Sequence, residues 1–341
     1  MLTRKNLIIV MAVLAVLVVL SVLQKARHNE ATSRASSEVL LAGEFGRGDL
    51  DRIVVGYGGE ETVVLTADDP AWLVSSAHGA RADHNKIDTL LSTLGGLRGE
   101  FRSGSAEVLP DFGFTDSATV SVRGFLGDRE IFALELGNKP EGSQGGFVKR
   151  PGSSDVFLSQ AGVLGNLGLW SGPGQPQSRH FLDLVAYQGV RENIAAIRLE
   201  GEQTVGLKRE FMMIEPAPDD TVRTEPYPDQ QNWEWTLADG TMVQKTKADG
   251  IMNAAVNLRA QNVADPAPGL ASYGLEPAAR TVTIVMHDGA EAVMHFGDEL
   301  PAEGDAPGGV FARINDEPTI WVVGTYAVDN LFKTRDELLP E

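Results

Sequence analysis

The sequence contains no cysteine, and this absence removes several kinds of chemistry at once. A chain without thiols forms no disulfide, binds no metal through thiolates and uses no cysteine nucleophile. It also carries no lipid-modified cysteine anchor. Basic residues are scarce as well, because 29 lysines and arginines stand against 47 acidic residues and leave a formal charge of -18. Phosphate binding needs a surplus of lysine and arginine, so this balance argues against a nucleic-acid partner.

The N-terminal segment differs from the rest of the chain. Residues 7–23 are apolar apart from Ser21, and Arg4 and Lys5 precede them. A helix of this length spans about 26 Å at about 1.5 Å per residue, which is near the lower limit for crossing a bilayer. A cleaved secretion signal is the alternative, but the nearest small-x-small site, Ser33-Arg34-Ala35, lies far beyond the apolar run. We therefore predict that residues 1–28 are an uncleaved transmembrane anchor.

The orientation of this anchor follows from its flanks and from what comes after it. Lys25 and Arg27 nearly balance the basic start, but long domains translocate largely regardless of charge. We expect a single-pass inner-membrane protein with residues 29–341 outside the cytoplasm. These residues hold 25 bases and 47 acids, a net charge of -22. Anionic headgroups would repel such a surface, so membrane contact is predicted to stop at residues 7–23.

An internal repeat with an almost constant offset organises the remaining residues. The matches fall in the same order in both halves, at offsets of 160–164 residues, and most involve aromatic, aliphatic or glycine residues. They pair Trp72 with Trp233, Leu90-Leu91 with Ile251-Met252, Phe112-Gly113-Phe114 with Tyr273-Gly274-Leu275, Leu136-Gly137 with Phe296-Gly297, and Val156-Phe157-Leu158 with Ile320-Trp321-Val322. Such ordered matches indicate that one domain has been duplicated. The glycines of the two triplets are predicted to adopt a left-handed or tight backbone.

Each copy shows the same pattern of expected elements. Period-two alternation predicts strands, and apolar residues spaced three and four apart predict a central helix over 85–97 in one copy and 247–258 in the other. A second helix is expected over 160–169 and 326–334. Strands in runs, with helices between the runs, indicate an α+β fold in which each copy has an antiparallel sheet and two helices. The predicted domains are 40–170 and 190–341, joined by a linker at 171–189 that contains a short helix over 180–189.

The copies differ between Glu215 and Asn232. This stretch has four prolines and five acidic residues where the first copy has a short turn. A surface loop on a hairpin is the simpler interpretation. A partner-binding flap is the functional alternative, because binding residues gather on loops.

Residue patterns that carry chemistry are absent or weak. His78, His84, His180, His287 and His295 are scattered, and none forms a two-histidine pair on a helix. Asp83, His84 and Asp88 fit a solvated helix start. The acidic loop from Asp298 to Asp305 lacks the ligand order of a calcium loop. We therefore predict no metal site and no cofactor.

Nucleophile and nucleotide motifs are equally weak. The stretch Glu141-Gly142-Ser143-Gln144-Gly145 lacks the first glycine of a hydrolase elbow, and no phosphate-loop lysine follows Gly162, Gly165 and Gly168. Trp72 and Trp233 occur at the same point of both copies, which favours core packing over a ligand platform. No catalytic residue is assigned, and the recurring residues indicate a scaffold.

These features resemble a bacterial family known as domain of unknown function 4340. The resemblance rests on the single N-terminal anchor, the tryptophan strand, the segment Tyr273-Gly274-Leu275-Glu276-Pro277, the Phe296-Gly297 step, the strand Phe311-Ala312-Arg313 and the closing Arg335-Asp336-Glu337-Leu338-Leu339. The second copy resembles the family more clearly than the first does. The resemblance implies an extracytoplasmic companion of ABC-type transport systems of the gliding-motility kind, and it carries over no catalytic residue.

Three functions remain as hypotheses. The first is a membrane-anchored, non-enzymatic accessory or binding module of an ABC-type transport system, whose partner would be a membrane transporter subunit. The second is an envelope hydrolase or carbohydrate-active enzyme with an unrecognised site. The third is a structural spacer of the envelope. Buried, mutually close polar residues in a cleft between the two copies would favour the enzyme, and an apolar patch at the anchor-proximal end would favour the accessory module.

Overall fold

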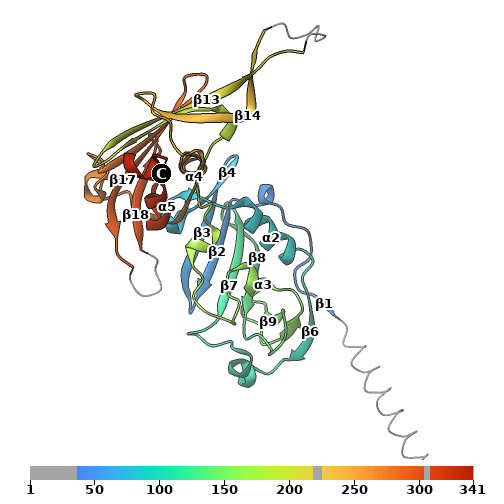
Figure 1. The fold of residues 1–341 in the computed structure, drawn as a ribbon. Coiled ribbons are helices and arrows are strands. Elements are labelled where there is room, and N and C mark those ends of the chain that lie inside the picture. The colour runs from blue at the N-terminus through green and yellow to red at the C-terminus, as the bar shows by residue number, and fades with distance from the viewer. Residues whose placement is uncertain (1–36, 218–224, 303–307, 341) are drawn as a thin grey trace, which may run out of the picture. The chain divides into compact units, whose positions relative to one another are not determined.

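The structure is a computed structural model that describes residues 37–217, 225–302 and 308–340. These residues fall into two compact units (Figure 1). The first contains residues 37–67 and 84–180, and the second contains residues 68–83 and 181–340. The predicted domain bounds, 40–170 and 190–341, had assigned residues 68–83 to the first copy.

The first unit is built on one antiparallel sheet with the strand order β1-β6-β10-β9-β8-β7-β2-β3. Its strands are β1 (Glu38–Val39), β2 (Arg52–Tyr57), β3 (Glu60–Asp68), β6 (Arg98–Ser103), β7 (Val120–Leu126), β8 (Arg129–Leu136), β9 (Gly146–Lys149) and β10 (Val156–Ser159). Its α-helices are α2 (His84–Leu94) and α3 (Val163–Asn166).

The second unit is built on a sheet with the order β11-β15-β19-β18-β17-β16-β12-β13-β14, again antiparallel. Its strands are β11 (Val185–Gln188), β12 (Ile194–Glu200), β13 (Thr204–Ile214), β14 (Tyr227–Leu237), β15 (Asn257–Ala264), β16 (Arg280–Met286), β17 (Glu291–Leu300), β18 (Gly309–Ile314) and β19 (Ile320–Val323). The α-helices are α4 (Lys245–Val256), α5 (Thr325–Leu331) and α6 (Arg335–Leu338). The short hairpin of β4 (Ala71–Val74) and β5 (Ala80–Arg81) groups with this unit.

The two sheets share one topology. Each strand of the first sheet has a counterpart that holds the same place along the chain and the same place in the second sheet, from β1 and β11 through β3 and β13. The central helices α2 and α4 also occupy the same place along the chain, directly before β6 and β15. Two tandem sheet-rich units with one strand order support the predicted duplication.

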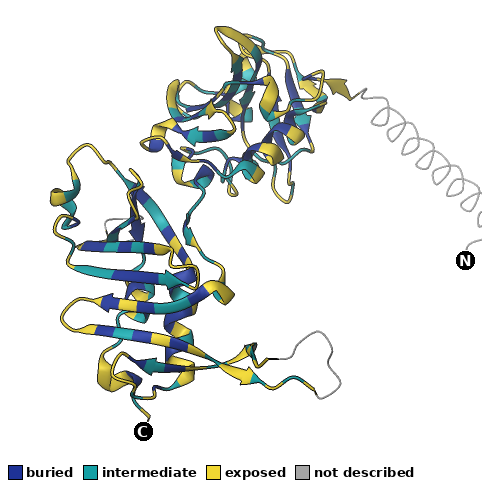
Figure 2. Cartoon of the chain, turned by 90° about the horizontal axis from the view of Figure 1, so that it is seen from above, coloured by how far each residue is buried: buried dark blue, intermediate teal, exposed yellow. Residues whose placement is uncertain are grey.

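The core of each unit lies on one face of its sheet. Along β7, Val120 and Val122 are buried while Ser121 and Arg123 are half-buried, so the strand presents an apolar face and a polar face. Helix α2 buries Ile87, Leu90, Leu91 and Leu94 at helical spacing. The same alternation of buried and exposed positions is visible along the strands of both sheets (Figure 2).

A step made of glycine and aromatic residues recurs in both units. Gly113 and Gly274 have φ of 83° and 64°, which confirms the predicted left-handed backbone. Beside them the edge-to-face ring pairs Phe112–Phe147 and Tyr273–Phe311 have centroid distances of 4.7 and 4.6 Å. The two copies thus share the same local geometry, in which the triplet fixes a turn against its own sheet. This shared role explains why the triplet occurs in both copies.

Some sequence predictions were wrong in detail. The predicted helices over 85–97 and 247–258 end earlier. Residues 95–97 form a turn before β6, and residues 257–258 begin β15, and the alternation predicted neither strand. Strand β6 has a mostly exposed, polar sequence without period-two alternation, so it carries no strand signal of its own. The predicted helix over 180–189 is wrong, because a 3-10 turn at Ser178–Phe181 is followed by β11.

The tryptophan pairing also needs correction. Trp72 is 3% exposed, but Trp233 is only half-buried, and the fully buried residue is Trp235. The backbone agrees, because the N–H of Ala82 donates to the Trp72 carbonyl and the N–H of Val243 donates to the Trp235 carbonyl. Trp72 therefore corresponds to Trp235. The offset of 161 residues pairs Trp72 with Trp233 instead. It fails at this position because the turn after Trp72 is two residues longer than the turn after Trp235.

The closing Arg335–Leu339 motif folds back on the second unit. The Arg335 guanidinium contacts the Asp239 carboxylate at 2.8 Å, and Leu338 is fully buried. Hydrogen bonds from Thr241, together with the Arg335 contact, lower the pKa of Asp239 to about 2. The Arg335–Leu339 motif thus has a structural role, because it holds the C-terminal segment against the turn that follows β14.

None of the helices in the described part of the chain is long and apolar enough to span a membrane. The predicted anchor at residues 7–23 lies outside the described residues.

Candidate functional site

The most distinctive feature of the second unit is a long hairpin, which we call the arm. It consists of the end of β13 from Phe211 onward and the start of β14 up to Trp233. Figure 1 shows these two strands extending beyond the rest of their sheet, and Figure 2 shows that the arm is mostly exposed. The predicted hairpin at the surface is therefore confirmed, but residues 227–232 of the predicted loop belong to β14, and residues 218–224 lie outside the described residues.

The arm is an addition to the duplicated domain. In the first copy β3 ends at Asp68 and β4 begins at Ala71, so two residues connect these strands. With Trp72 matched to Trp235, the residues from Phe211 to Trp233 have no counterpart in the first copy. The arm is thus where the two copies differ most.

Aromatic rings and cations hold the base of the arm. Phe211 and Trp233 are paired across β13 and β14. The guanidinium of Arg209 lies 4.3 Å from the Trp233 ring and 4.4 Å from the Phe211 ring. Lys245 and Arg191 approach the Trp233 ring at 4.2 and 5.2 Å. Cation–π contacts of this kind contribute about 0.5–2 kcal/mol each, and the larger values apply to desolvated groups.

The same base is tied to helix α4. The indole N–H groups of Trp233 and Trp235 both donate to Oδ1 of Asp249, at 2.9 and 2.8 Å. One carboxylate on the helix therefore orients the first ring of the arm and the core ring of the domain together. Because both donors share one acceptor, the arm's direction is coupled to the packing of α4.

Arg209 is the most unusual charge in this region. It is 4% exposed, and its Nη1 donates to the carbonyls of Arg191 and Ile194 at 2.7 and 3.3 Å. Burial lowers the pKa of Arg209, and the nearby positive charge of Arg191 lowers it further, while Asp249 acts in the opposite direction. Burying a cation is costly unless it is compensated, so its position between two rings indicates a specific structural requirement.

A bulge separates the base of the arm from its tip. Phe211 is opposite Trp233, but Met213 is already opposite Pro228, so residues 229–232 form an excess on β14. Asp229 stabilises this bulge by accepting hydrogen bonds from the N–H of Gln231 at 2.9 Å and from Asn232 Nδ2 at 2.6 Å. These hydrogen bonds lower the pKa of Asp229. The bulge re-aims the tip relative to the sheet.

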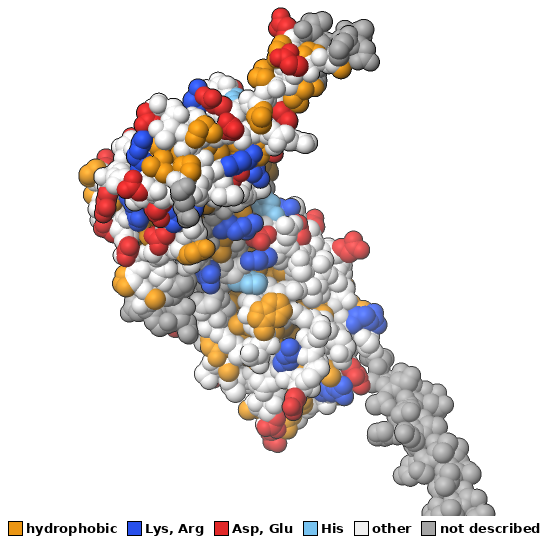
Figure 3. Space-filling view, in the orientation of Figure 1, with side chains coloured by type: hydrophobic (Ala, Val, Ile, Leu, Met, Phe, Trp, Pro, Cys, Tyr) orange, Lys and Arg blue, Asp and Glu red, His pale blue; other side chains and the backbone are white. Residues whose placement is uncertain are grey.

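The tip presents apolar side chains to solvent. Met212 and Met213 are 55% and 59% exposed, and they are consecutive in the chain. Acidic residues flank them, including Glu210, Glu215 and Glu225. Figure 3 shows hydrophobic side chains along the arm next to acidic ones. Flexible, polarizable methionine side chains are common at protein-binding surfaces.

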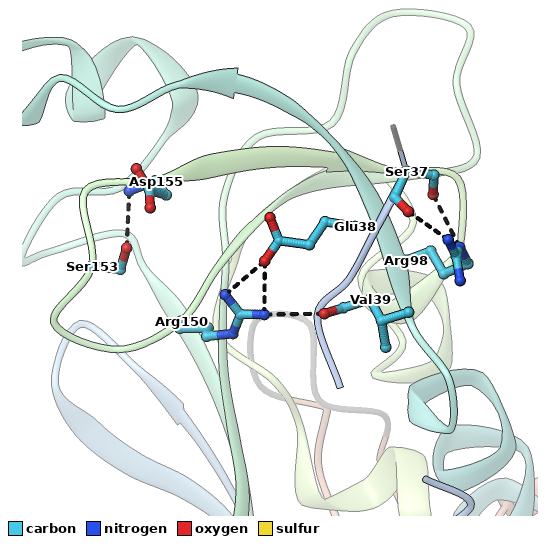
Figure 4. Close-up of polar contacts among 7 residues, drawn as sticks. All are labelled: Ser37, Glu38, Val39, Arg98, Arg150, Ser153 and Asp155. Carbon is cyan, nitrogen blue, oxygen red and sulfur yellow. Dashed lines mark hydrogen bonds and ion pairs between the residues drawn. The ribbon is translucent and has the colours of Figure 1, made fainter. Parts of the chain in front are cut away.

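At the other end of the chain, the first described residues are clamped onto the first unit (Figure 4). Both terminal nitrogens of Arg150 contact Glu38 Oε1, at 3.2 and 3.1 Å, and Nη2 also donates to the Val39 carbonyl at 3.0 Å. Arg98 donates to the carbonyl and the hydroxyl of Ser37. Strand β1 is thereby secured where the chain arrives from its N-terminal segment.

The histidines singled out in the sequence lie at separate places. His78 pairs with Asp265 at 3.5 Å, His180 contacts the Asn166 carbonyl at 3.1 Å, and His295 lies 3.4 Å from the Thr281 hydroxyl. His287 packs on Phe211 at the base of the arm, with a centroid distance of 5.3 Å. Within residues 37–217, 225–302 and 308–340, no three histidine or acidic side chains are grouped to hold a metal ion. Part of the acidic loop Asp298–Asp305 lies outside these ranges.

The sequence analysis missed Arg209, Lys245 and Asp249 as members of one cluster. Arg209 follows buried Val205 and Leu207 at the same period-two spacing along β13, which was the available signal of a buried cation. The cluster itself depends on the fold, because it unites β13, β14 and α4. Chemically, it can orient a binding surface, and it contains no nucleophile beside a base.

The fold and this site define a duplicated, sheet-rich scaffold with one projecting arm. A model of the domain of unknown function (DUF4340) matches residues 72–164 and 228–339, which together make up more than half of the chain. The chain therefore belongs to this family, and the two matched regions fall in the two copies of the repeat. Neither the curated proteins nor the solved structures include a significant match.

Proposed function

We propose that this protein is a membrane-anchored, extracytoplasmic accessory module that binds a membrane transporter subunit, of the ABC type, through its arm. The observation that carries the proposal is the arm itself, because it is present in one copy only and exposes two consecutive methionines. Residues that recur in both copies serve packing and turns. The specialised part is therefore a surface for binding.

The base of the arm supports a binding role. The contacts of Trp233 with Arg209, Lys245 and Asp249 hold the base of the arm in one orientation. A preorganised element loses less conformational entropy when a partner binds it. Because the Trp233 cluster already fixes the base of the arm, binding of a partner to the tip does not have to order the base as well.

Charge and polarity indicate the chemistry of the partner. Residues 215–232 include five acidic residues and one arginine, and the exposed methionines directly precede them. We expect the partner to offer an apolar groove with a rim of lysine or arginine. Complementary charge of this kind raises the association rate and selects the partner.

An arm-shortened variant tests the proposal directly. Residues 212–232 are replaced by Asn-Gly, which joins the paired residues Phe211 and Trp233 in a two-residue hairpin turn. The full chain, gently extracted in detergent, should co-purify with a multi-span permease, and the shortened chain should lose it. The Trp233 cluster remains, so both forms should have the same urea midpoint of unfolding.

Single-site variants sharpen the comparison. Met212→Ser with Met213→Ser should weaken partner retention at least tenfold, since burying a methionine side chain contributes about 1.5–3 kcal/mol. Met242→Ser is the matched control, because Met242 is also exposed but lies outside the arm. Recovery of the chain alone, or equal retention by the shortened chain, would count against the proposal and favour the envelope spacer or enzyme.

A further inference from the structure

The first unit contains a cavity that the arm does not explain. Its volume is about 710 Å³, which lies within the range of small-molecule sites, about 300–1,000 Å³. It lies on the polar face of the sheet, where Ser121 and Arg123 of β7, Glu135 of β8 and Lys149 of β9 line it. This is the face opposite the buried valines of β7.

The lining includes a buried cation, Lys149. The Lys149 side chain is 9% exposed and forms an ion pair with Glu135, directly opposite it in the register of β8 and β9. Its ammonium also lies 5.5 Å from the Phe114 ring. Lysine side chains are rarely buried unless they are paired. Ligand pockets commonly contain a few charged groups of this kind, which orient the bound molecule.

The lining is balanced in charge. Lys149 is paired with Glu135, and Arg123 is paired with Glu61 at 2.9 Å. Glu61 lies outside the lining, which itself holds two cations, Lys149 and Arg123, and two anions, Glu135 and Asp116. An anionic ligand would have to displace Glu135 or Glu61 from its cation. A neutral ligand avoids this cost.

Hydroxyl groups complete the lining. Thr115, Thr119 and Ser121 contribute hydroxyl groups to the lining. The Thr119 hydroxyl donates to the Thr115 carbonyl at 2.7 Å, which leaves its lone pairs to accept a hydrogen bond. Within the part of the chain that the structure describes, the Ser121 hydroxyl and the Asp116 carboxylate make no side-chain hydrogen bond. Carboxylates that accept two hydrogen bonds, next to an ammonium that donates up to three, suit the adjacent hydroxyls of a sugar ring.

The second copy differs at this point. In the first copy Gly56 is opposite Ser121, and in the second copy Glu200 is opposite Thr281. A side chain added at Gly56 would meet the Ser121 hydroxyl at 2.6 Å, so the glycine leaves this hydroxyl accessible. The pair Glu135–Lys149 is replaced by His295–Arg313 at the same register.

From this charge-balanced, hydroxyl-rich lining we infer that the cavity of the first unit binds a short neutral saccharide. Lys149 and Arg123 would donate to ring or hydroxyl oxygens, and Glu135 and Asp116 would accept from hydroxyl groups. This site is distinct from the arm and does not depend on the proposed transporter partner.

Calorimetric titration of the full chain tests this inference. The chain is held in a detergent without a sugar headgroup, and maltose, N,N′-diacetylchitobiose and sodium sulfate are titrated separately. At least one disaccharide should bind, and sulfate should not. Asp116→Ala removes an exposed acceptor without touching the core and should weaken disaccharide binding about tenfold, the loss expected for one hydrogen bond to a charged group.

Glu135→Gln gives a second, more specific readout. This variant should also bind the disaccharide about tenfold more weakly, and it should gain sulfate binding because Lys149 loses its ionic partner. His295→Gln, at the equivalent position of the second copy, should change neither. The inference is overturned if neither disaccharide binds, if binding is unchanged in both Asp116→Ala and Glu135→Gln, or if the unaltered chain binds sulfate instead.

Discussion

Replacing Trp235 with alanine should lower the free energy of unfolding by about 3–5 kcal/mol, as expected when a fully buried tryptophan is truncated. The variant also removes one of the two hydrogen bonds to Asp249. Trp72→Ala should have an effect of the same size, because Trp72 is the buried counterpart in the other copy. Urea unfolding followed by circular dichroism measures all of these variants.

Trp233→Ala is the comparison that decides the tryptophan pairing. Trp233 is half-buried and its main contacts are cationic, so its removal should cost about 1–2 kcal/mol. The corrected pairing requires Trp72 and Trp235 to behave alike and Trp233 to differ. If Trp233→Ala were as destabilising as Trp72→Ala while Trp235→Ala had little effect, the correction would be wrong.

Gly297→Ala should destabilise the second unit by about 1–3 kcal/mol, the range for forcing atoms into a packed site. A methyl group at Gly297 would lie 2.0 Å from the Tyr273 carbonyl oxygen, so the backbone itself would have to move. Gly137 meets the Phe112 carbonyl at 2.2 Å in the same step of the first unit. Gly137→Ala should therefore have a matching effect, measured by thermal unfolding.

Gly250→Ala is the control for these variants. Gly250 is exposed within helix α4, and apart from its chain neighbours and the helix's own backbone no heavy atom lies within 4 Å of the position that its added methyl group would take. The substitution should stabilise the protein by about 0.5–1 kcal/mol, since alanine is the better helix former. Equal destabilisation by all three substitutions would mean that the glycines act through general flexibility and not through the shared step.

Repeated local patterns made the domain architecture predictable from the sequence. Alternation over residues 119–123 predicts a strand where the structure has β7 (Val120–Leu126), and the spacing of Leu90 and Leu91 located helix α2. Ordered matches at a nearly constant offset then revealed the duplication without any structure. These signals are local or repeated, so a single chain carries them.

Features that depend on pairing between distant segments were not predictable in this way. Strand β6 has a polar sequence, and it is a strand because it pairs with β1 and β10. The cluster at the base of the arm combines Arg209, Trp233 and Asp249, which lie on three elements. The offset of 161 residues misassigned Trp233, because a difference in turn length cannot be seen from the offset alone. The cavity beside Lys149 likewise requires the register of three strands.

In-cell photo-crosslinking is the most direct test of the claim that the arm is the partner-binding element. A photoreactive phenylalanine derivative is placed at Met213, and in a separate strain at Tyr326, which is 81% exposed on α5 and outside the arm. The derivative at Met213 should crosslink to a multi-span membrane protein, and the derivative at Tyr326 should not. No crosslink from Met213, or the same crosslinked partner from Tyr326, would contradict the account.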